Sequence, residues 1–261
     1  MVGSARWSLR SGIARTPFLR TTLLPVVREY HRARWALRQL RKPLHRNPPL
    51  NGQARRRECI EALLAALRPE EVLETGTFRG STTLYLAKVQ SAPVHSVEMD
   101  KYFWLASSLR CLPTRQVRVR FGDSLEFLHE RAAGGGGNRL TFFYLDAHWG
   151  ERLPLADEVA FILRTWREAL LCIDDFRVDD DPGYRFDSYE GIALSLDYLA
   201  PVLPEGLAVF APAARSETET GARSGSVYIA VGSQATNRVS RCVPAFLRPV
   251  SIGRLHPPTE R

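Results

Sequence analysis

The chain has 261 residues, of which 44% are hydrophobic, and this suits one large α/β domain with additional segments. Its net charge of +8 averages two unlike parts, because residues 1–57 hold 14 Arg or Lys and a single acid, Glu29, and so carry +13. The remaining residues therefore carry −5, which argues against a domain that binds nucleic acid specifically. No apolar run in the sequence approaches the ~20 residues of a membrane span.

Cysteine usage favours a reducing compartment. The four cysteines are scattered, without a Cys-x-x-Cys pair and without a histidine at the spacing of a zinc site; they are Cys59, Cys111, Cys172 and Cys242. We therefore expect reduced, packed thiols in a cytoplasmic protein.

Residues 1–52 are predicted to form a basic N-terminal arm. Residues 1–25 are rich in Arg, Ser and Thr, which is typical of a disordered arm or of a transit peptide, and they contain no evident secretory signal. Residues 26–44 have the period of a basic amphipathic helix, which would pack on the domain, contact a partner or lie on an anionic membrane. Prolines then predict a linker over residues 43–52.

Helical and extended patterns alternate over residues 53–232, the predicted folded domain. A helix is predicted over 53–67, where the apolar residues follow a helical period. Strands are predicted at 72–75, 94–98, 117–121, 140–145 and 169–174. Further helices are predicted at 81–90, 101–110, 124–132, 154–166 and 188–200. Alternation at this spacing indicates βαβ units and a parallel sheet.

The end of the chain has a different pattern. No helical segment separates the apolar runs 207–210 and 226–231, and the connection between them is polar, so an antiparallel hairpin is predicted. Residues 233–261 contain four prolines and little periodicity, and they are predicted to form a tail.

The rest of the domain is organised around residues 72–83, where a short apolar run ends in a carboxylate and a glycine-containing turn follows. Gly76 can adopt a positive φ and lets the backbone approach a ligand closely. Gly80 lets the next helix pack tightly on the strand, and Ser81 or Thr82 can cap that helix. The loop amides would then face a ligand beyond the carboxyl end of the strand.

Five parallel strands followed by a hairpin, with the loop Glu74-x-Gly76-x-x-x-Gly80-Ser81, resemble the class I S-adenosylmethionine-dependent methyltransferases over about residues 55–232. The loop lacks the middle glycine that is common in that superfamily. It resembles the loop of the catechol O-methyltransferase-like branch and of sugar O-methyltransferases from antibiotic pathways. The resemblance implies an α/β, Rossmann-like, seven-stranded and mostly parallel sheet with a reversed C-terminal strand and helices on both faces.

Two further strand ends carry acids suited to a nucleoside cofactor. Glu98 lies 22 positions after Gly76, where a carboxylate can accept hydrogen bonds from both ribose hydroxyls; the alternative is a solvated loop acid. Asp123 can cap the next helix or bind the adenine amine. By the resemblance, the predicted contacts to S-adenosylmethionine are Glu74, Gly76, Thr77, Gly80, Ser81, Glu98, Asp123, Asp146 and Trp149.

A cluster of acids is expected at the ends of the fourth and fifth strands. Asp146 follows the fourth strand, and Asp174 and Asp175 follow the fifth. Three converging carboxylates raise one another's pKa unless a cation neutralises them, and oxygen ligands suit Mg²⁺. The resemblance implies that these three residues bind Mg²⁺ or a similar divalent cation, which would hold a substrate hydroxyl and lower its pKa. The alternative is that they are a strand-end acid and a solvated acidic loop.

The catalytic base is less clearly indicated. The catechol enzymes use a lysine shortly after the fourth-strand Asp, and none is present here. His148 has a suitable intrinsic pKa for this role, although it could equally hydrogen-bond ligand or loop backbone, and Asp146 is the second catalytic candidate. Trp149 is predicted to cover the adenine or the substrate.

These observations predict methyl transfer from S-adenosylmethionine to a hydroxyl oxygen of a small molecule, assisted by a divalent metal. The alternatives are a non-catalytic binding or scaffold protein, which the missing lysine favours, and a related metal-dependent hydroxylase. The acidic and aromatic segment 177–189 is the candidate region for acceptor specificity. The predicted partners are the hydroxylated small molecule and a membrane surface or protein bound by the arm, with a homo-oligomer left open.

Overall fold

The computed structural model describes residues 48–147 and 153–250, together with eight residues between Val26 and Arg38. The chain divides into two compact units, Met1–Lys42 and Pro43–Arg261. In the first unit the eight described residues are helical, and there Arg34 donates a hydrogen bond of 2.9 Å to the Tyr30 hydroxyl. They agree with the helix predicted within residues 26–44, whose binding role stays a prediction.

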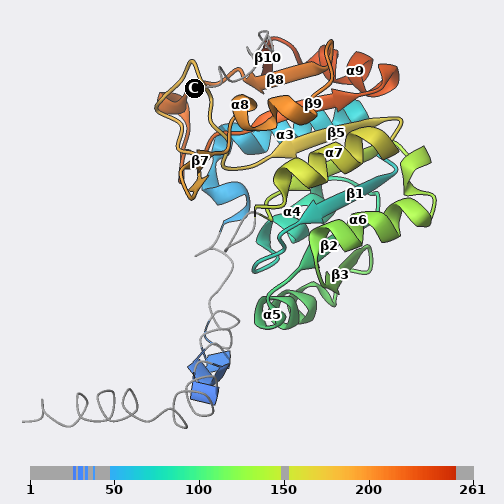
Figure 1. Ribbon diagram of the computed structural model, residues 1–261, viewed down its shortest axis with the longest axis vertical. Helices are drawn as coiled ribbons and strands as arrows, with labels where there is room; N and C mark the ends of the chain where they lie inside the picture. The colour runs from blue at the N-terminus through green and yellow to red at the C-terminus, as the bar shows by residue number, and fades with distance from the viewer. Residues whose placement is uncertain are drawn as a thin grey trace, which may run out of the picture. The chain divides into compact units, whose positions relative to one another are not determined.

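The second unit is built on an eight-stranded sheet of order β10-β8-β9-β5-β4-β1-β2-β3 (Figure 1). The strands are β1 (Glu71–Thr75), β2 (Val94–Glu98), β3 (Val117–Phe121), β4 (Thr141–Leu145), β5 (Ala169–Ile173), β8 (Ala208–Pro212), β9 (Val227–Val231) and β10 (Leu247–Pro249). Strands β1 to β5 are parallel to one another, whereas β9 is antiparallel to both β5 and β8. The predicted mostly parallel sheet with a reversed strand is confirmed, and β10 adds an eighth strand.

The central strands are buried along their whole length. Every residue of β1, β4, β5 and β9 is buried, as expected for strands with helices on both faces. Alternate residues of each strand enter two separate core clusters, so that Phe142 and Tyr144 pack on one face and Phe143 and Leu145 on the other. All four cysteines are buried and free, which agrees with the predicted packed thiols.

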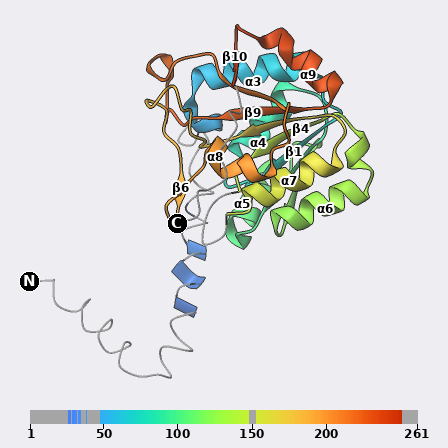
Figure 2. The same cartoon turned by 45° about the horizontal axis from the view of Figure 1, so that its top comes forward.

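Helices cover both faces of the sheet. They are α3 (Ala54–Leu67), α4 (Ser81–Val89), α5 (Lys101–Cys111), α6 (Ser124–Ala133), α7 (Leu155–Thr165), α8 (Leu196–Leu199) and α9 (Ser233–Val239). Buried residues of α3, α4 and α9 belong to one core cluster, and those of α6, α7 and α8 belong to the other. Figure 2 shows the sheet between α3 and α9 on one side and α6 and α7 on the other. The predicted βαβ arrangement is therefore confirmed.

The helix predicted over residues 188–200 is wrong for most of its length. The chain forms a two-stranded hairpin of β6 (Ser188–Tyr189) and β7 (Ile192–Ala193), and only then α8. Glu190 and Gly191 both have positive φ, which is the geometry of a tight hairpin turn. The turn therefore overrides the helical period that the apolar residues suggest.

The two ends of the predicted domain also differ from expectation. Residues 49–52, assigned above to the linker, form a short 3₁₀ helix, η2 (Pro49–Gly52), and Leu50 lies in the core. Within the predicted tail, α9 packs on α3 and β10 pairs with β8. Val239 and Leu247 are fully buried, so a few apolar residues suffice to attach these short elements to an existing sheet.

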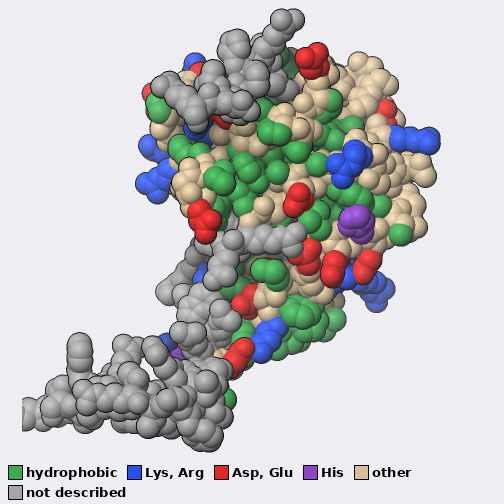
Figure 3. Space-filling view, in the orientation of Figure 1, with side chains coloured by type: hydrophobic (Ala, Val, Ile, Leu, Met, Phe, Trp, Pro, Cys, Tyr) green, Lys and Arg blue, Asp and Glu red, His purple; other side chains and the backbone are tan. Residues whose placement is uncertain are grey.

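The surface carries both signs of charge. Figure 3 shows basic and acidic side chains scattered among apolar and neutral ones on the visible face, without a continuous basic area among the residues described there. Within the described ranges, no helix has the length and apolar character needed to cross a membrane.

Candidate active site

The candidate site lies at the carboxyl ends of β1 and β4, which are neighbours in the sheet. The chain leaves β1 for α4 on one face of the sheet, and it leaves β4 for α7 on the opposite face. This is the topological switch point, the position where open α/β sheets bind their ligands.

Gly76 is required by the backbone at this point. Its φ is +86°, and a Cβ placed on it would lie 2.3 Å from the carbonyl oxygen of Asp146. The Gly76 amide donates to the Val97 carbonyl (3.0 Å), and the Asp146 amide donates to the Thr75 carbonyl (3.0 Å). The backbone of Gly76 thus closely approaches the end of β4, which leaves no room for a side chain at this position.

Gly80 has a different packing role from the one predicted. It is the N-cap of α4 with a φ of +74°, and a Cβ there would lie 3.2 Å from Cys111 Sγ, so that it allows α4 to approach α5 rather than the strand. Neither Ser81 nor Thr82 occupies the N-cap position. The Thr82 hydroxyl instead accepts a hydrogen bond from the Leu50 amide (3.2 Å).

Glu98 is held rigidly beside the glycine loop. Its Oε2 accepts a hydrogen bond from the Phe78 amide (2.7 Å), and its Oε1 accepts one from the Asp100 amide (2.9 Å). Burial raises the pKa of Glu98 above its ordinary value, and these backbone donors partly oppose the shift. The carboxylate is therefore fixed at the end of β2, where contact with ribose hydroxyls is predicted.

Two of the other predicted cofactor residues have clear roles inside the protein. Asp123 caps α6 by accepting hydrogen bonds from the Leu125 amide (2.9 Å) and the Glu126 amide (3.2 Å), which confirms the first of its two predicted roles. The buried Thr77 hydroxyl lies 2.5 Å from the Ser96 hydroxyl. Contacts of Asp123 and Thr77 with adenosine stay predictions.

Glu74 is almost fully buried behind the loop. Its Oε2 accepts hydrogen bonds from the Thr83 hydroxyl and from the Ser96 hydroxyl (2.6 Å). Burial raises the pKa of Glu74 from 4.5 to about 7, because the charged form loses its hydration. Glu74 therefore joins β1, β2 and α4 beneath the loop, and a direct contact with a cofactor stays a prediction.

Replacing Glu74 by glutamine is expected to stabilise the protein at pH 8 and to have little effect at pH 4.5 or below. The pKa of Glu74 rises from 4.5 in the unfolded chain to about 7 in the folded one. The stability that protonated Glu74 contributes is therefore fully present below pH 4.5 and is lost as the pH rises through about 7. Ionisation of Glu74 should cost about 3 kcal/mol at pH 8. Glutamine avoids this cost and keeps an oxygen for both hydroxyls.

Urea unfolding of both proteins across this pH range measures the effect. Glu205→Gln, at an exposed position, is the matched control and should change little. A stability difference between Glu74→Gln and the wild type that stays constant with pH would contradict the prediction.

The predicted acidic cluster is brought together at this edge. Burial raises the pKa of Asp146 well above its ordinary value, and the charges of Asp174 and Asp175 raise it further. The amide of Asp174 donates to the Leu145 carbonyl (3.1 Å), which keeps the ends of β4 and β5 in register. Asp146 and Asp174 thus follow neighbouring strands, as the strand order implied, and the convergence of all three acids on one point stays a prediction.

A buried arginine already neutralises one of these acids. Arg56 of α3 donates from Nη1 to Asp174 Oδ1, and the Tyr144 hydroxyl donates to Asp174 Oδ2. The side chains of Arg56 and Asp174 are 2% and 1% exposed. Within residues 48–147 and 153–250, no group of three or more His, Cys, Asp and Glu is arranged to hold a metal ion. The structure thus does not support the predicted metal site, because Asp174 is used in an ion pair.

Arg56 was missed because it lies in a run of three arginines counted with the basic arm. The spacing of Arg56 nevertheless indicates a position on the buried face of α3. Arg56, Ile60, Leu63 and Leu67 follow one another at intervals of three or four residues, and all four are buried. An arginine on the apolar face of a helix indicates a buried acidic partner.

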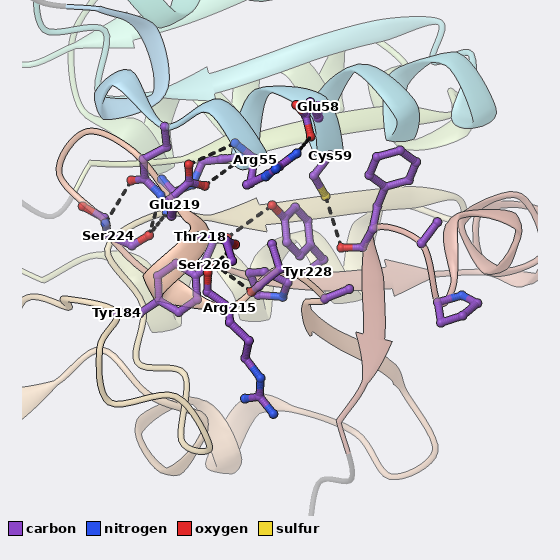
Figure 4. A pocket seen from close by; sticks show the side chains of 18 residues that line it. Arg55, Glu58, Cys59, Tyr184, Arg215, Thr218, Glu219, Ser224, Ser226 and Tyr228 are labelled. Atoms are coloured by element: carbon purple, nitrogen blue, oxygen red, sulfur yellow. Dashed lines mark hydrogen bonds and ion pairs between the residues drawn. The ribbon is translucent and has the colours of Figure 1, made fainter.

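The N-terminus of α3 is fixed to the connection between β8 and β9. Glu219 accepts hydrogen bonds from the Arg55 and Arg56 amides (3.0 and 2.9 Å), and Gln53 exchanges two hydrogen bonds with the backbone of Ser224 (both 2.9 Å). A cavity of about 410 Å³ lies beside this junction, and Figure 4 shows Glu219 and Ser224 close to α3 at its wall. The described residues that line it include none of the predicted cofactor contacts.

Two predicted residues, His148 and Trp149, lie outside the described residues. Their roles as catalytic base and as cover for the adenine or the substrate stay predictions.

No protein-family model matches the chain, and no curated protein matches it in sequence. Among solved structures, an O-methyltransferase from Bacillus cereus in complex with SAH has a TM-score of 0.52 and 16% identity, over 76% of this chain and 90% of that one. Cofactor-bound Rv0187 from MTB has a TM-score of 0.51 and 19% identity, over 82% and 94%. The O-methyltransferase TomG from Streptomyces achromogenes, in complex with SAM, has a TM-score of 0.50 and 17% identity, over 67% and 79%.

These likenesses extend over most of each chain, at identities that establish the fold alone. They agree with the parallel sheet, its reversed strand β9 and the helices on both faces. The chain therefore has the fold of the class I S-adenosylmethionine-dependent O-methyltransferases.

Proposed function

We propose that this protein is a methyltransferase that binds S-adenosylmethionine and methylates a hydroxyl oxygen of a small molecule. The observation that carries the proposal is the Glu98 carboxylate, fixed by the Phe78 and Asp100 amides at the end of β2, next to the Gly76 turn. A carboxylate at this place in a nucleotide-binding sheet is suited to two ribose hydroxyls. The solved complexes of TomG with SAM and of the Bacillus cereus enzyme with SAH support the choice of cofactor.

The residues of the edge fit such a cofactor. S-adenosylmethionine would supply a methyl group on a positively charged sulfonium. Glu98 would accept hydrogen bonds from its ribose, and the loop from Gly76 to Gly80 would approach it with backbone atoms.

Methyl transfer to a hydroxyl requires the acceptor to lose a proton while donor and acceptor are held in line. Asp146 is the described candidate for the proton acceptor, since it lies at the switch point and burial raises the pKa of its carboxyl well above the ordinary value. His148 is the other candidate. The divalent cation implied by the resemblance is left out of this proposal, because Asp174 is paired with Arg56.

The segment after β5 is proposed to select the acceptor. Arg177 pairs there with Asp179 (2.5 Å) and Asp197 (2.9 Å), and the Tyr189 hydroxyl donates to Asp187 (3.1 Å). Polar and aromatic groups are thus held next to the acidic edge, the end of β4 and β5 that carries Asp146, Asp174 and Asp175. An acceptor with hydroxyl groups would lie there.

Titration calorimetry with S-adenosylmethionine and its demethylated product tests the cofactor. The wild type should bind both, and Glu98→Ala should weaken binding by about 1–3 kcal/mol, because the ribose hydroxyls would lose their acceptor. The exposed Glu205→Ala should bind like the wild type.

Absence of binding by the wild type, or equal binding by Glu98→Ala, would contradict the proposal. Incubation with labelled S-adenosylmethionine and a panel of hydroxylated small molecules then separates an enzyme, which transfers label, from a protein that only binds the cofactor.

A further inference from the structure

The acidic edge contains its own cation. Asp174 and Asp175 lie close enough to Asp146 for their charges to act on it, and buried carboxylates of this kind are stabilised by a positive charge nearby. The guanidinium of Arg56 supplies one by direct contact with Asp174, and both side chains are almost completely buried.

Asp174 has no acceptor position left for a metal ion. Its Oδ1 accepts from Arg56 and from the Asp175 amide (2.7 Å), and its Oδ2 accepts from the Tyr144 hydroxyl and, at 3.5 Å, from the Asn51 amide group. An ionised carboxylate offers about four such positions. A divalent ion would have to displace these donors and would lie against a guanidinium of the same sign.

Arg56 is also prevented from moving aside. Its Nη2 donates to the carbonyl oxygens of Ser224 and Gly225, the latter at 2.8 Å, and its own backbone amide donates to Glu219. A guanidinium that left this place would abandon three buried acceptors, which makes displacement by a weakly binding ion such as Mg²⁺ unfavourable.

We infer that the guanidinium of Arg56 takes the place of a metal cation at this acidic edge, so that methyl transfer by this protein needs no divalent metal. The inference rests on the proposed function only for the methyl transfer; the exclusion of the metal depends on the ion pair alone. Arg56 is a positioning residue in this scheme, because it acts through Asp174.

The first test uses the wild-type protein after treatment with a chelator. Electron paramagnetic resonance of Mn²⁺ should show no stoichiometric binding, and Mn²⁺ should leave the melting temperature unchanged. Methyl transfer in excess chelator should stay within about twofold of the rate with Mg²⁺. Binding of one Mn²⁺ per chain, or a loss of transfer in chelator that Mn²⁺ restores, would overturn the inference.

The second test removes the guanidinium. In Arg56→Gln the three acids lose their cation, so Mn²⁺ should now bind and raise the melting temperature by several degrees. Adding Asp174→Asn should abolish this gain, and Arg56→Lys, which keeps the charge, should not show it. If a folded Arg56→Gln protein gains no Mn²⁺ binding, Arg56 is not what excludes the metal. If the variant does not fold, the wild-type measurements still decide the question.

Failure of this inference can be told apart from failure of the proposed function. Mn²⁺ binding requires no acceptor and no cofactor, whereas the proposed function is tested by calorimetry with S-adenosylmethionine on the chelated protein. Transfer that depends on Mn²⁺ would overturn the inference and keep the function. A wild type that binds neither ligand would overturn the function and leave the exclusion of the metal supported.

Discussion

Arg56→Ala is expected to lower the free energy of unfolding by about 3–5 kcal/mol, because it leaves the Asp174 carboxylate buried without its cation. Both partners are nearly inaccessible to water, so solvent cannot replace the lost contact. The substitution also strips the Ser224 and Gly225 carbonyls of a donor. Urea denaturation of the purified protein measures the loss.

Arg55→Ala is the matched control, one residue away on the same helix. The Arg55 side chain is 50% exposed and pairs with Glu58 at 2.9 Å, and exposed pairs of this kind contribute at most about 1 kcal/mol. In an Asp174→Asn background Arg56→Ala should cost less, since no buried charge is then left behind. Equal losses for the Arg55 and Arg56 variants would show that the buried pair does not anchor α3.

Asp146→Asn is expected to lower kcat by about 10²–10⁴-fold, the usual contribution of a positioned proton acceptor. The substitution keeps the size of the side chain and removes its ability to take a proton. Cofactor affinity should change much less than kcat. Asp157→Asn, at an exposed position of α7, should leave kcat unchanged.

The pH dependence gives a second measurement of the same prediction. Burial and the neighbouring acids raise the pKa of Asp146, and only the ionised form can accept a proton. The wild-type rate should therefore fall with decreasing pH, and the fall should begin at a pH well above that at which an ordinary aspartate titrates. This decrease should be absent in Asp146→Asn. If Asp146→Asn keeps the wild-type rate and the same decrease at low pH, His148 becomes the leading candidate for the base.

The sequence by itself was sufficient to predict every strand of the sheet except β10. Strand β5 is an unbroken apolar run of five residues, β4 is apolar or aromatic after Thr141, and both are fully buried. Such strands alternate with helices along the chain. Burial on two faces requires a continuous apolar run, and a parallel connection requires a helix, so the pattern permits few other folds. Gly76, Glu98 and Asp146 could be singled out from the sequence because each directly follows or ends a predicted strand.

Only the tertiary structure decided the roles of these acids. Asp174 was predicted as a metal ligand from its place after β5, but its partner Arg56 lies 118 residues earlier. The hairpin at 188–193 replaced a predicted helix, and β10 joined the sheet from a segment predicted as a tail. Local pattern reports which face of an element is apolar. Which charged side chains meet at a sheet edge depends on how distant elements pack, and the local sequence pattern does not indicate it.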